Sequence, residues 1–351
     1  MPTAASRAWT PDYRRLLAAI TGRERPDRLP FIDLRADDGA VEKVLGEAFG
    51  SHGSEAEQLR RRADLLVRCA QALTFDCVWA RVSVPFPGLG VTVASDGRQW
   101  IHTGTGAIGS RADFERYAWP EPGVFSSAPF ETLADRVPDG MGIFSTTSGV
   151  FENATRLLGP EGFAYAMADA PDLVADVLRA VGERVLAHFE GVAAVDCVRL
   201  CWMGEDLGHR TGLLASPAFL RKHVFPWHRR IVEAVHARRK PLVLHSCGNL
   251  REVMEDLIHL GIDAKHSFED AIMPVTEAVR LYSDRIGLLG GIDVHLLARG
   301  TEDDVRAVTR RTIEACAPSG RWALGSGNTF TDYIPVANYL AMLDEGRKTW
   351  G

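Results

Sequence analysis

The residues of this chain that could do chemistry are concentrated in the segment 242–249, which reads LVLHSCGN. A short apolar run, typical of a buried strand, ends at His245, and Cys247 follows two positions later. Residues i and i+2 of a strand point to the same face, so an imidazole and a thiolate would lie side by side. Zinc accepts both ligands. A buried cysteine beside a hydrogen-bonded histidine is the alternative, and two ligands alone leave the choice open.

The elements that must position this pair alternate between short apolar segments and longer amphipathic ones. The strands we expect are 30–34, 75–80, 142–146, 198–202, 242–245, 262–265, 286–289 and 322–324, and the helices include 218–238, 250–260, 275–282, 302–315 and 336–348. Eight strand–helix units in 351 residues predict a single (β/α)₈ TIM barrel, one domain over 1–351. An open doubly wound sheet is the rival, but its Gly-x-Gly-x-x-Gly motif does not follow the first strand.

One insertion into this barrel is predicted. Segment 91–103 alternates in polarity around Asp96-Gly97, which is typical of a β-hairpin, and it follows the second strand.

Polar side chains follow most of the expected strands, where a barrel carries its active site. In chain order the candidates are Asp33, Arg35, Ser148, Glu205, Asp206, His245, Cys247, His266, Glu269, Asp293, Asn328 and Tyr333. Any one of them is more often solvated or a helix cap than catalytic. Asp293, for example, could cap the helix that begins near His295, and Ser148 could begin a helix or an anion site.

Composition narrows the class of protein. The net charge of -6 argues against nucleic acid or an anionic membrane as the main partner. No apolar run approaches the roughly 20 residues that span a bilayer, and the first residues carry no apolar signal core. Six scattered cysteines are typical of reduced thiols, so we expect a cytoplasmic protein.

Several segments together resemble the uroporphyrinogen decarboxylase superfamily, which includes cobalamin- and zinc-dependent methyltransferases. They are 13–31, 204–208, 241–250 with its His-x-Cys-Gly, 289–294 with its Gly-Gly-Ile-Asp, and 323–328. The resemblance covers nearly the whole chain and implies a (β/α)₈ barrel with its site at the carboxyl ends of the strands.

The superfamily divides at the first strand. The decarboxylases carry an Arg-Gln-Ala-Gly-Arg motif there, whose arginines hold the substrate carboxylates. In this chain 31–38 reads FIDLRADD, with one arginine and three aspartates. Like charges would repel a substrate with many carboxylates. We therefore favour the methyltransferase branch, and keep a metal-independent carboxy-lyase acting on a tetrapyrrole or other carboxylated substrate as the alternative.

The methyltransferase resemblance implies a metal site. The zinc ligands of the thiol-methylating members map onto His245 and Cys247, but Ser326 stands where those members have a further cysteine. An oxygen ligand would then come from Glu205, Asp206 or Glu269, and we favour Glu269 because its strand neighbours that of His245.

The resemblance also implies a reaction. A methyl group would pass between a small methylated substrate, such as an ether, and a corrinoid on a partner protein, and the chain could form a homodimer. Tyr333 or His266 would donate a proton, with Asp293 as a third candidate catalytic residue. The substrate-binding candidates are Asp33, Arg35, Ser148, Asp206 and Asn328.

Overall fold

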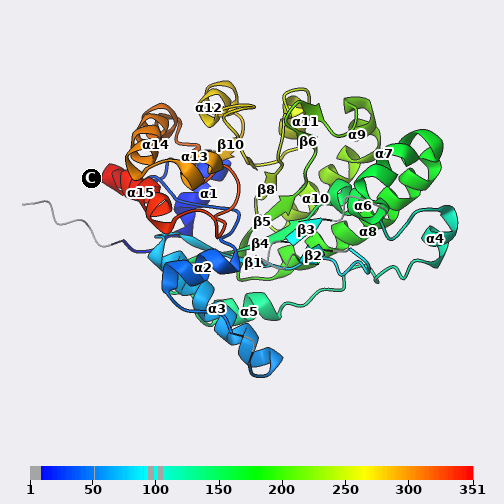
Figure 1. The fold of residues 1–351 in the computed structure, drawn as a ribbon, viewed down its shortest axis with the longest axis horizontal. Helices are drawn as coiled ribbons and strands as arrows, with labels where there is room; N and C mark the ends of the chain where they lie inside the picture. Colours follow the sequence, from blue (N-terminus) through cyan, green and yellow to red (C-terminus); the bar gives the residue numbers. More distant parts are fainter. Residues whose placement is uncertain (1–8, 51, 90, 94–98, 102–105, 351) are drawn as a thin grey trace, which may run out of the picture.

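The computed structural model describes residues 9–50, 52–89, 91–93, 99–101 and 106–350, and its centre is a curled parallel sheet (Figure 1). Seven strands follow one another in the order β1-β4-β5-β8-β9-β10-β11, and every neighbouring pair is parallel. They are β1 (Cys77–Arg81), β4 (Gly142–Ser148), β5 (Val198–Gly204), β8 (Leu242–His245), β9 (Ala264–His266), β10 (Gly287–Leu289) and β11 (Trp322–Ala323). The alternation of strands and helices that the sequence predicts is therefore present.

The first expected strand, 30–34, is reduced to a single parallel bridge between Phe31 and Leu324. Two backbone hydrogen bonds of 2.9 Å support it, from Ile32 N–H to Leu324 O and from Leu324 N–H to Pro30 O. This segment extends the sheet beyond β11. The described residues thus form a curled sheet with the geometry of a half-barrel.

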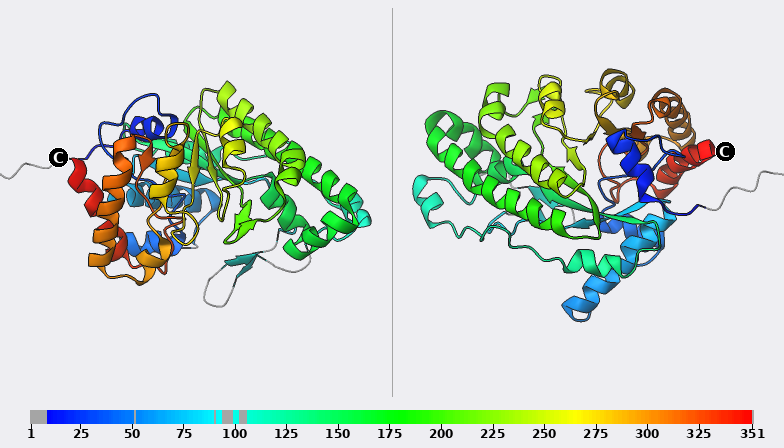
Figure 2. Two further views of the ribbon diagram at one scale, coloured as in Figure 1. Left: turned by 90° about the horizontal axis from the view of Figure 1, so that it is seen from above. Right: turned by 180° about the vertical axis from the view of Figure 1, so that it is seen from behind.

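Helices surround the curled sheet (Figures 1 and 2). They are α1 (Tyr13–Thr21), α2 (Asp38–Leu45), α3 (Glu55–Ala72), α4 (Arg111–Arg116), α5 (Ala128–Ala134), α6 (Val150–Leu158), α7 (Pro160–Asp169), α8 (Pro171–Ala194), α9 (Pro217–His223), α10 (Phe225–Ala237), α11 (Met254–His259), α12 (Val275–Tyr282), α13 (Val294–Arg299), α14 (Glu302–Cys316) and α15 (Val336–Arg347), with 3₁₀ turns at Ala317–Ser319 and Lys348–Trp350. The helix expected over 218–238 is divided into α9 and α10 after His223. Pro226 lacks an N–H and is tolerated only in a first helical turn, so a new helix begins at Phe225.

Two small hairpins lie outside the main sheet (Figure 2). β2 (Val91–Val93) pairs antiparallel with β3 (Gln99–Ile101) after β1, at the predicted place. The predicted turn Asp96-Gly97 and the end of the predicted hairpin lie outside the described residues.

The second hairpin pairs β6 (Gly208–His209) with β7 (Gly212–Leu213). It packs against the loop after Cys247, where Gly248 has a φ of +85°. A Cβ at position 248 would lie 2.2 Å from the carbonyl carbon of Gly208. Only glycine permits this approach, which fixes the loop that carries the cysteine.

The space between sheet and helices is filled by a continuous apolar core. Its largest fully buried side chains include Trp202, Trp322 and Tyr339. None of the helices within the described ranges combines the length and the apolar character that a membrane crossing requires.

Candidate metal centre

Asp206, His245 and Cys247 meet at the carboxyl ends of β5 and β8. His245 Nε2 lies 3.5 Å from Cys247 Sγ and 3.8 Å from Asp206 Oδ1. The backbone N–H of Cys247 donates to Asp206 Oδ1 at 2.8 Å, which ties the two strand ends together. All three ligand atoms lie within 4.8 Å of one another, and no other set of three metal-ligating side chains in the described ranges does so.

The spacing of these atoms fits a zinc ion. With zinc–nitrogen and zinc–sulfur bonds of about 2.1 and 2.3 Å, a tetrahedral site separates nitrogen from sulfur by about 3.6 Å. The 3.5 Å between His245 and Cys247 agrees with that value. Three protein ligands leave a fourth tetrahedral position open, as in catalytic rather than structural zinc sites.

His266 orients the His245 ring. The two Nδ1 atoms are 2.8 Å apart, and His266 packs edge-on against Trp202. Burial lowers the pKa of His245 to about 4, so this imidazole is neutral at neutral pH. A ligating Nε2 requires the proton on Nδ1, which then donates to His266 Nδ1. His266 was predicted to donate a proton to substrate, and the structure places it behind a candidate ligand.

The Cys247 sulfur accepts hydrogen bonds from two loops. Asn328 Nδ2 donates at 3.2 Å and Ser267 Oγ at 3.5 Å. Burial, with the Asp206 carboxylate, raises the pKa of the Cys247 thiol to about 12. The thiol therefore stays protonated at neutral pH unless a cation stabilises the thiolate, and a metal ion supplies that charge.

Glu205, a predicted metal ligand, lies outside the three-residue cluster. Its buried carboxylate accepts the backbone N–H groups of Phe151 at 2.8 Å and Glu152 at 2.9 Å, and it contacts His228 Nε2 at 2.7 Å. It thereby caps α6, a helix whose own N-cap, Gly149, has no side chain. A Cβ at position 149 would lie 2.5 Å from the Glu205 carboxyl carbon.

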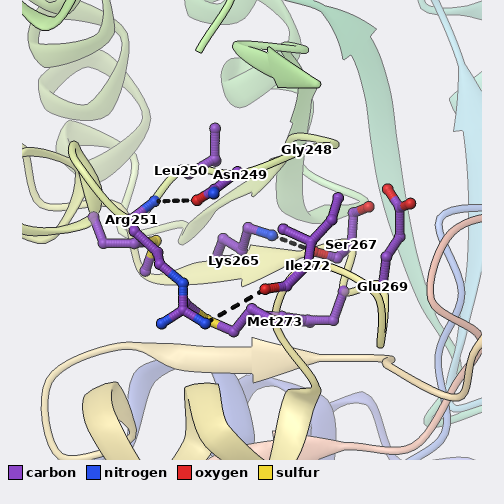
Figure 3. Close-up of a pocket in the computed structure, with 11 residues that line it drawn as sticks. Gly248, Asn249, Leu250, Arg251, Lys265, Ser267, Glu269, Ile272 and Met273 are labelled. Carbon is purple, nitrogen blue, oxygen red and sulfur yellow. Dashed lines mark hydrogen bonds between the residues drawn. The ribbon is translucent and has the colours of Figure 1, made fainter. Parts of the chain in front are cut away.

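Glu269, the favoured oxygen ligand, is exposed on a small pocket beside the cluster (Figure 3). The pocket holds about 20 Å³, enough for one water molecule. Its walls include Lys265, Ser267 and Arg251. Of the three candidate oxygen ligands, the structure brings Asp206, which was also predicted to bind substrate, to His245 and Cys247.

Asp33 and Ser326 form a separate, closed cluster with Tyr339. Ser326 Oγ donates to Asp33 Oδ1 at 2.7 Å, and Tyr339 OH donates to Asp33 Oδ2. All three residues are fully buried. The serine at the expected cysteine position is therefore committed to Asp33.

A cavity of about 1720 Å³ opens beside β1 and α2. Its walls include Arg35, Arg81 and the 61% exposed Tyr333. No hydrogen bond or ion pair joins the guanidinium of Arg35 or Arg81 to another described residue. Burial, together with the nearby charge of Arg81, lowers the pKa of Arg35.

Two of the three aspartates from which the sequence predicted a repulsive entrance make local contacts. Asp37 caps α2 by accepting the Ala40 N–H at 2.9 Å, and Asp38 pairs with Arg62 at 2.7 Å. The described residues that line the cavity also include Lys43, Arg81 and Arg299, so cationic side chains outnumber the carboxylates of Asp37, Asp38 and Asp332 there. The sequence prediction counted only the charges of segment 31–38, whereas the fold brings cationic side chains from other segments to the same cavity.

Two other predicted residues make local contacts. Ser148 Oγ donates to Glu152 Oε1 at 3.3 Å. Asp293 caps α13 by accepting the His295 N–H at 2.7 Å, and its other oxygen accepts the Asp270 N–H at 3.2 Å.

Sequence reasoning missed three residues of this region: Glu152, Lys265 and Ser267. Burial, together with the carboxylates of Asp206 and Glu205, raises the pKa of Glu152 to about 7. Glu152 lies in the first turn of the helix that follows Ser148, and this position after a candidate site residue was the available signal. The signal for Lys265 was a charged residue inside an otherwise apolar strand.

Comparisons with known proteins agree with this architecture. A search of curated proteins finds no match. Among solved structures, a methyltransferase from Methanosarcina mazei superposes with a TM-score of 0.71 at 18% identity, over 96% of this chain and 98% of that one. The family model "Uroporphyrinogen decarboxylase (URO-D)" matches residues 14–349. This chain therefore belongs to the uroporphyrinogen decarboxylase family.

Proposed function

We propose that the protein is a zinc-dependent methyltransferase, which moves a methyl group between a small methylated substrate, such as an ether, and a corrinoid on a partner protein. The observation that carries this proposal is the convergence of an oxygen, a nitrogen and a sulfur ligand in Asp206, His245 and Cys247. The family and the fold of the methyltransferase neighbour support it.

In this proposal Asp206, His245 and Cys247 hold the metal, and His266 keeps His245 in the ligating tautomer. Bound zinc supplies Lewis acidity, which polarises a substrate heteroatom without redox change. Asn328 supports the cysteine ligand, because its amide donates a hydrogen bond to the Cys247 sulfur at 3.2 Å.

An ether oxygen leaves poorly unless it is protonated, so the site needs an acid. Glu152 suits that role, because burial and two neighbouring carboxylates raise its pKa to about 7. Tyr333, on the cavity wall, is the second candidate. Either would deliver its proton to the leaving oxygen as the methyl–oxygen bond breaks.

Arg35 and Arg81 indicate the substrate class. Arg35 and Arg81 form no ion pair within the described part of the chain, and two such guanidinium groups on one cavity wall repel each other and attract an anion. We therefore propose that the methylated substrate carries a carboxylate or a similar anionic group, which Arg35 and Arg81 bind.

The same arginines favour a second candidate function, a metal-independent carboxy-lyase. A cavity of about 1720 Å³ could admit a large carboxylated substrate. In that case Arg35 and Arg81 would bind carboxylates, and turnover would not depend on metal content.

The proposal also covers the closure of the barrel, the domain organisation, the partner protein, the oligomeric state and the cellular location. We propose that segment 30–34 closes the sheet as an eighth strand and that 1–351 is one domain with the β2–β3 hairpin inserted. The Phe31–Leu324 bridge supports the closure. The corrinoid protein, a homodimer and a cytoplasmic location are proposed from the family resemblance.

The test is the metal content of the purified full-length protein by elemental analysis. We expect about one zinc per chain in the wild type, and its loss in the His245→Ala/Cys247→Ala variant. Cys197→Ala is the matched control, since Cys197 lies half-buried outside the cluster.

Methyl transfer to cob(I)alamin from a methoxybenzoate, which is an anionic aryl ether, would then be followed by absorbance. Zinc-dependent transfer supports the methyltransferase. A metal-free protein, with a variant as well folded as the wild type, contradicts it and favours the carboxy-lyase.

A further inference from the structure

Strand β9 contains a buried lysine that the proposed chemistry does not use. Lys265 is 4% exposed and lies in register with Leu244 of β8 and Leu288 of β10. Successive strand residues face opposite sides, so His266 points toward His245 while Lys265 points to the other side of the sheet. No carboxylate in the described ranges forms an ion pair with Lys265. An ammonium group buried without a carboxylate is unfavourable unless its contacts compensate.

Those contacts lie in the loop that follows the lysine's own strand. Lys265 Nζ donates to the carbonyl oxygen of Ser267 and lies 4.1 Å from the ring centroid of Phe268. Figure 3 shows the lysine side chain directed at Ser267, and both residues line the small pocket. The ammonium therefore joins the strand end to the turn beyond it.

The turn that the lysine holds has an unfavourable backbone conformation. Ser267 has a φ of +81°, a region that residues other than glycine rarely adopt. Beyond it, the Phe268 N–H donates to Gly327 O at 3.2 Å, so the turn is also attached to the loop after β11. Such a conformation persists only where surrounding contacts impose it.

The strained turn directs a hydroxyl at the candidate metal ligand. Ser267 Oγ donates to Cys247 Sγ at 3.5 Å, and the Asn328 amide donates to the same sulfur at 3.2 Å. A Ser267 with negative φ would direct its side chain elsewhere. Hydrogen bonds to a ligating sulfur tune its donor strength and the metal affinity of the site.

We propose that Lys265 is a positioning residue, which holds Ser267 in its left-handed conformation and so directs the serine hydroxyl onto the Cys247 sulfur. The effect on the metal rests on the proposed function, whereas the clamp on Ser267 does not. The opposing interpretation is a purely structural lysine that fills the space beside Met254 and Met273.

The clamp is tested in metal-free, full-length protein by denaturant unfolding. Ser267→Gly removes the strain, because glycine adopts positive φ freely. With Lys265 present, Ser267→Gly should increase the ratio of folded to unfolded protein. The increase should be about fivefold larger than in a Lys265→Met background, because the turn has already relaxed there. Equal effects in both backgrounds would overturn the proposal.

The consequence for the metal is tested with Co²⁺, whose sulfur-to-cobalt charge-transfer band reports on the thiolate. Lys265→Met and Ser267→Ala should each shift this band and weaken Co²⁺ binding about tenfold. The double variant should show no further shift of the band, because both changes remove the same hydrogen bond, from Ser267 Oγ to Cys247 Sγ.

The control is Lys240→Met. Lys240 is also part-buried and donates to a backbone carbonyl, that of Val195 at 2.6 Å, but away from the cluster. Its cobalt spectrum should match the wild type. A Lys265→Met variant with a wild-type spectrum and affinity, and lower stability alone, would contradict the positioning role.

If wild-type protein binds no Co²⁺, the proposed function fails. The unfolding comparison then decides the clamp by itself, so the two failures are distinguishable.

Discussion

Asp33, beside the Phe31–Leu324 bridge, and Asp206, just after β5, are two aspartates that the fold uses in opposite ways. Both oxygens of Asp33 are engaged, by Ser326 and Tyr339, and the side chain is fully buried. The Asp206 side chain is 46% exposed and faces His245 and the backbone N–H of Cys247. Free lone pairs and access to solvent, rather than residue type, distinguish a candidate ligand from a structural carboxylate.

The strongest test of this contrast replaces candidate oxygen ligands one at a time. Asp206→Ala should weaken zinc binding by more than about 100-fold, because a ligand is lost rather than a supporting contact. Glu269→Ala and Asp33→Asn should leave it unchanged. Competition with a chromogenic chelator measures the affinities. A loss confined to Glu269→Ala would transfer the ligand role to the residue that the sequence favoured.

The pH dependence of stability tests the burial of the Asp33 carboxyl group. Burial raises the pKa of Asp33 from 3.8 to about 7 in the folded protein. The folded state therefore binds this proton more tightly than the unfolded chain. Between about pH 4 and pH 7 the Asp33 contribution lowers the free energy of unfolding as the pH rises, by up to about 1.4 kcal/mol per pH unit.

Asp33→Asn stays uncharged and lacks this slope. Its stability relative to the wild type should improve steadily from about pH 5 to about pH 7 in urea unfolding. Parallel profiles for the two proteins would show that Asp33 is ionised throughout this range.

Substitutions of Arg35 and Arg81 test whether the large cavity binds an anionic substrate. Arg35→Ala and Arg81→Ala should each raise the KM for a methoxybenzoate about tenfold, with little change in kcat, because a charge-assisted hydrogen bond is lost. Arg62→Ala is the control, since Arg62 lines the same cavity but pairs with Asp38. Equal losses for the uncharged methoxybenzene would contradict an anion site.

The smallest effect is expected at Asp293. Its two oxygens accept backbone N–H groups, so Asp293→Ala should cost about 1 kcal/mol of stability through the lost cap of α13. Turnover per folded molecule should be retained. Loss of turnover at unchanged stability would instead support the catalytic role predicted from the sequence.

Local sequence predicted the elements well where one signal dominated. The bounds of β8 and α12 agree with the prediction, because an apolar run and a helical period end there at clear polar breaks. The prediction of a single helix over 218–238 was wrong. The apolar period continues through Pro226, but proline lacks the N–H that a continuous helix requires at that position. Segment 30–34 forms only a bridge, because pairing depends on a partner strand far away in the sequence.

The sequence by itself determined the parallel α/β architecture, the family and the pairing of His245 with Cys247, because each is recognisable from local periodicity and short motifs along the chain. Which carboxylate joins that pair was decided by tertiary structure. Glu205, Asp206 and Glu269 all follow strands, but Glu205 is used by the N-terminus of α6, Glu269 faces a separate pocket, and Asp206 reaches the cysteine loop. Ligand sets, charge pairing and the left-handed Ser267 depend on contacts between distant segments, and packing creates those contacts only when the chain folds.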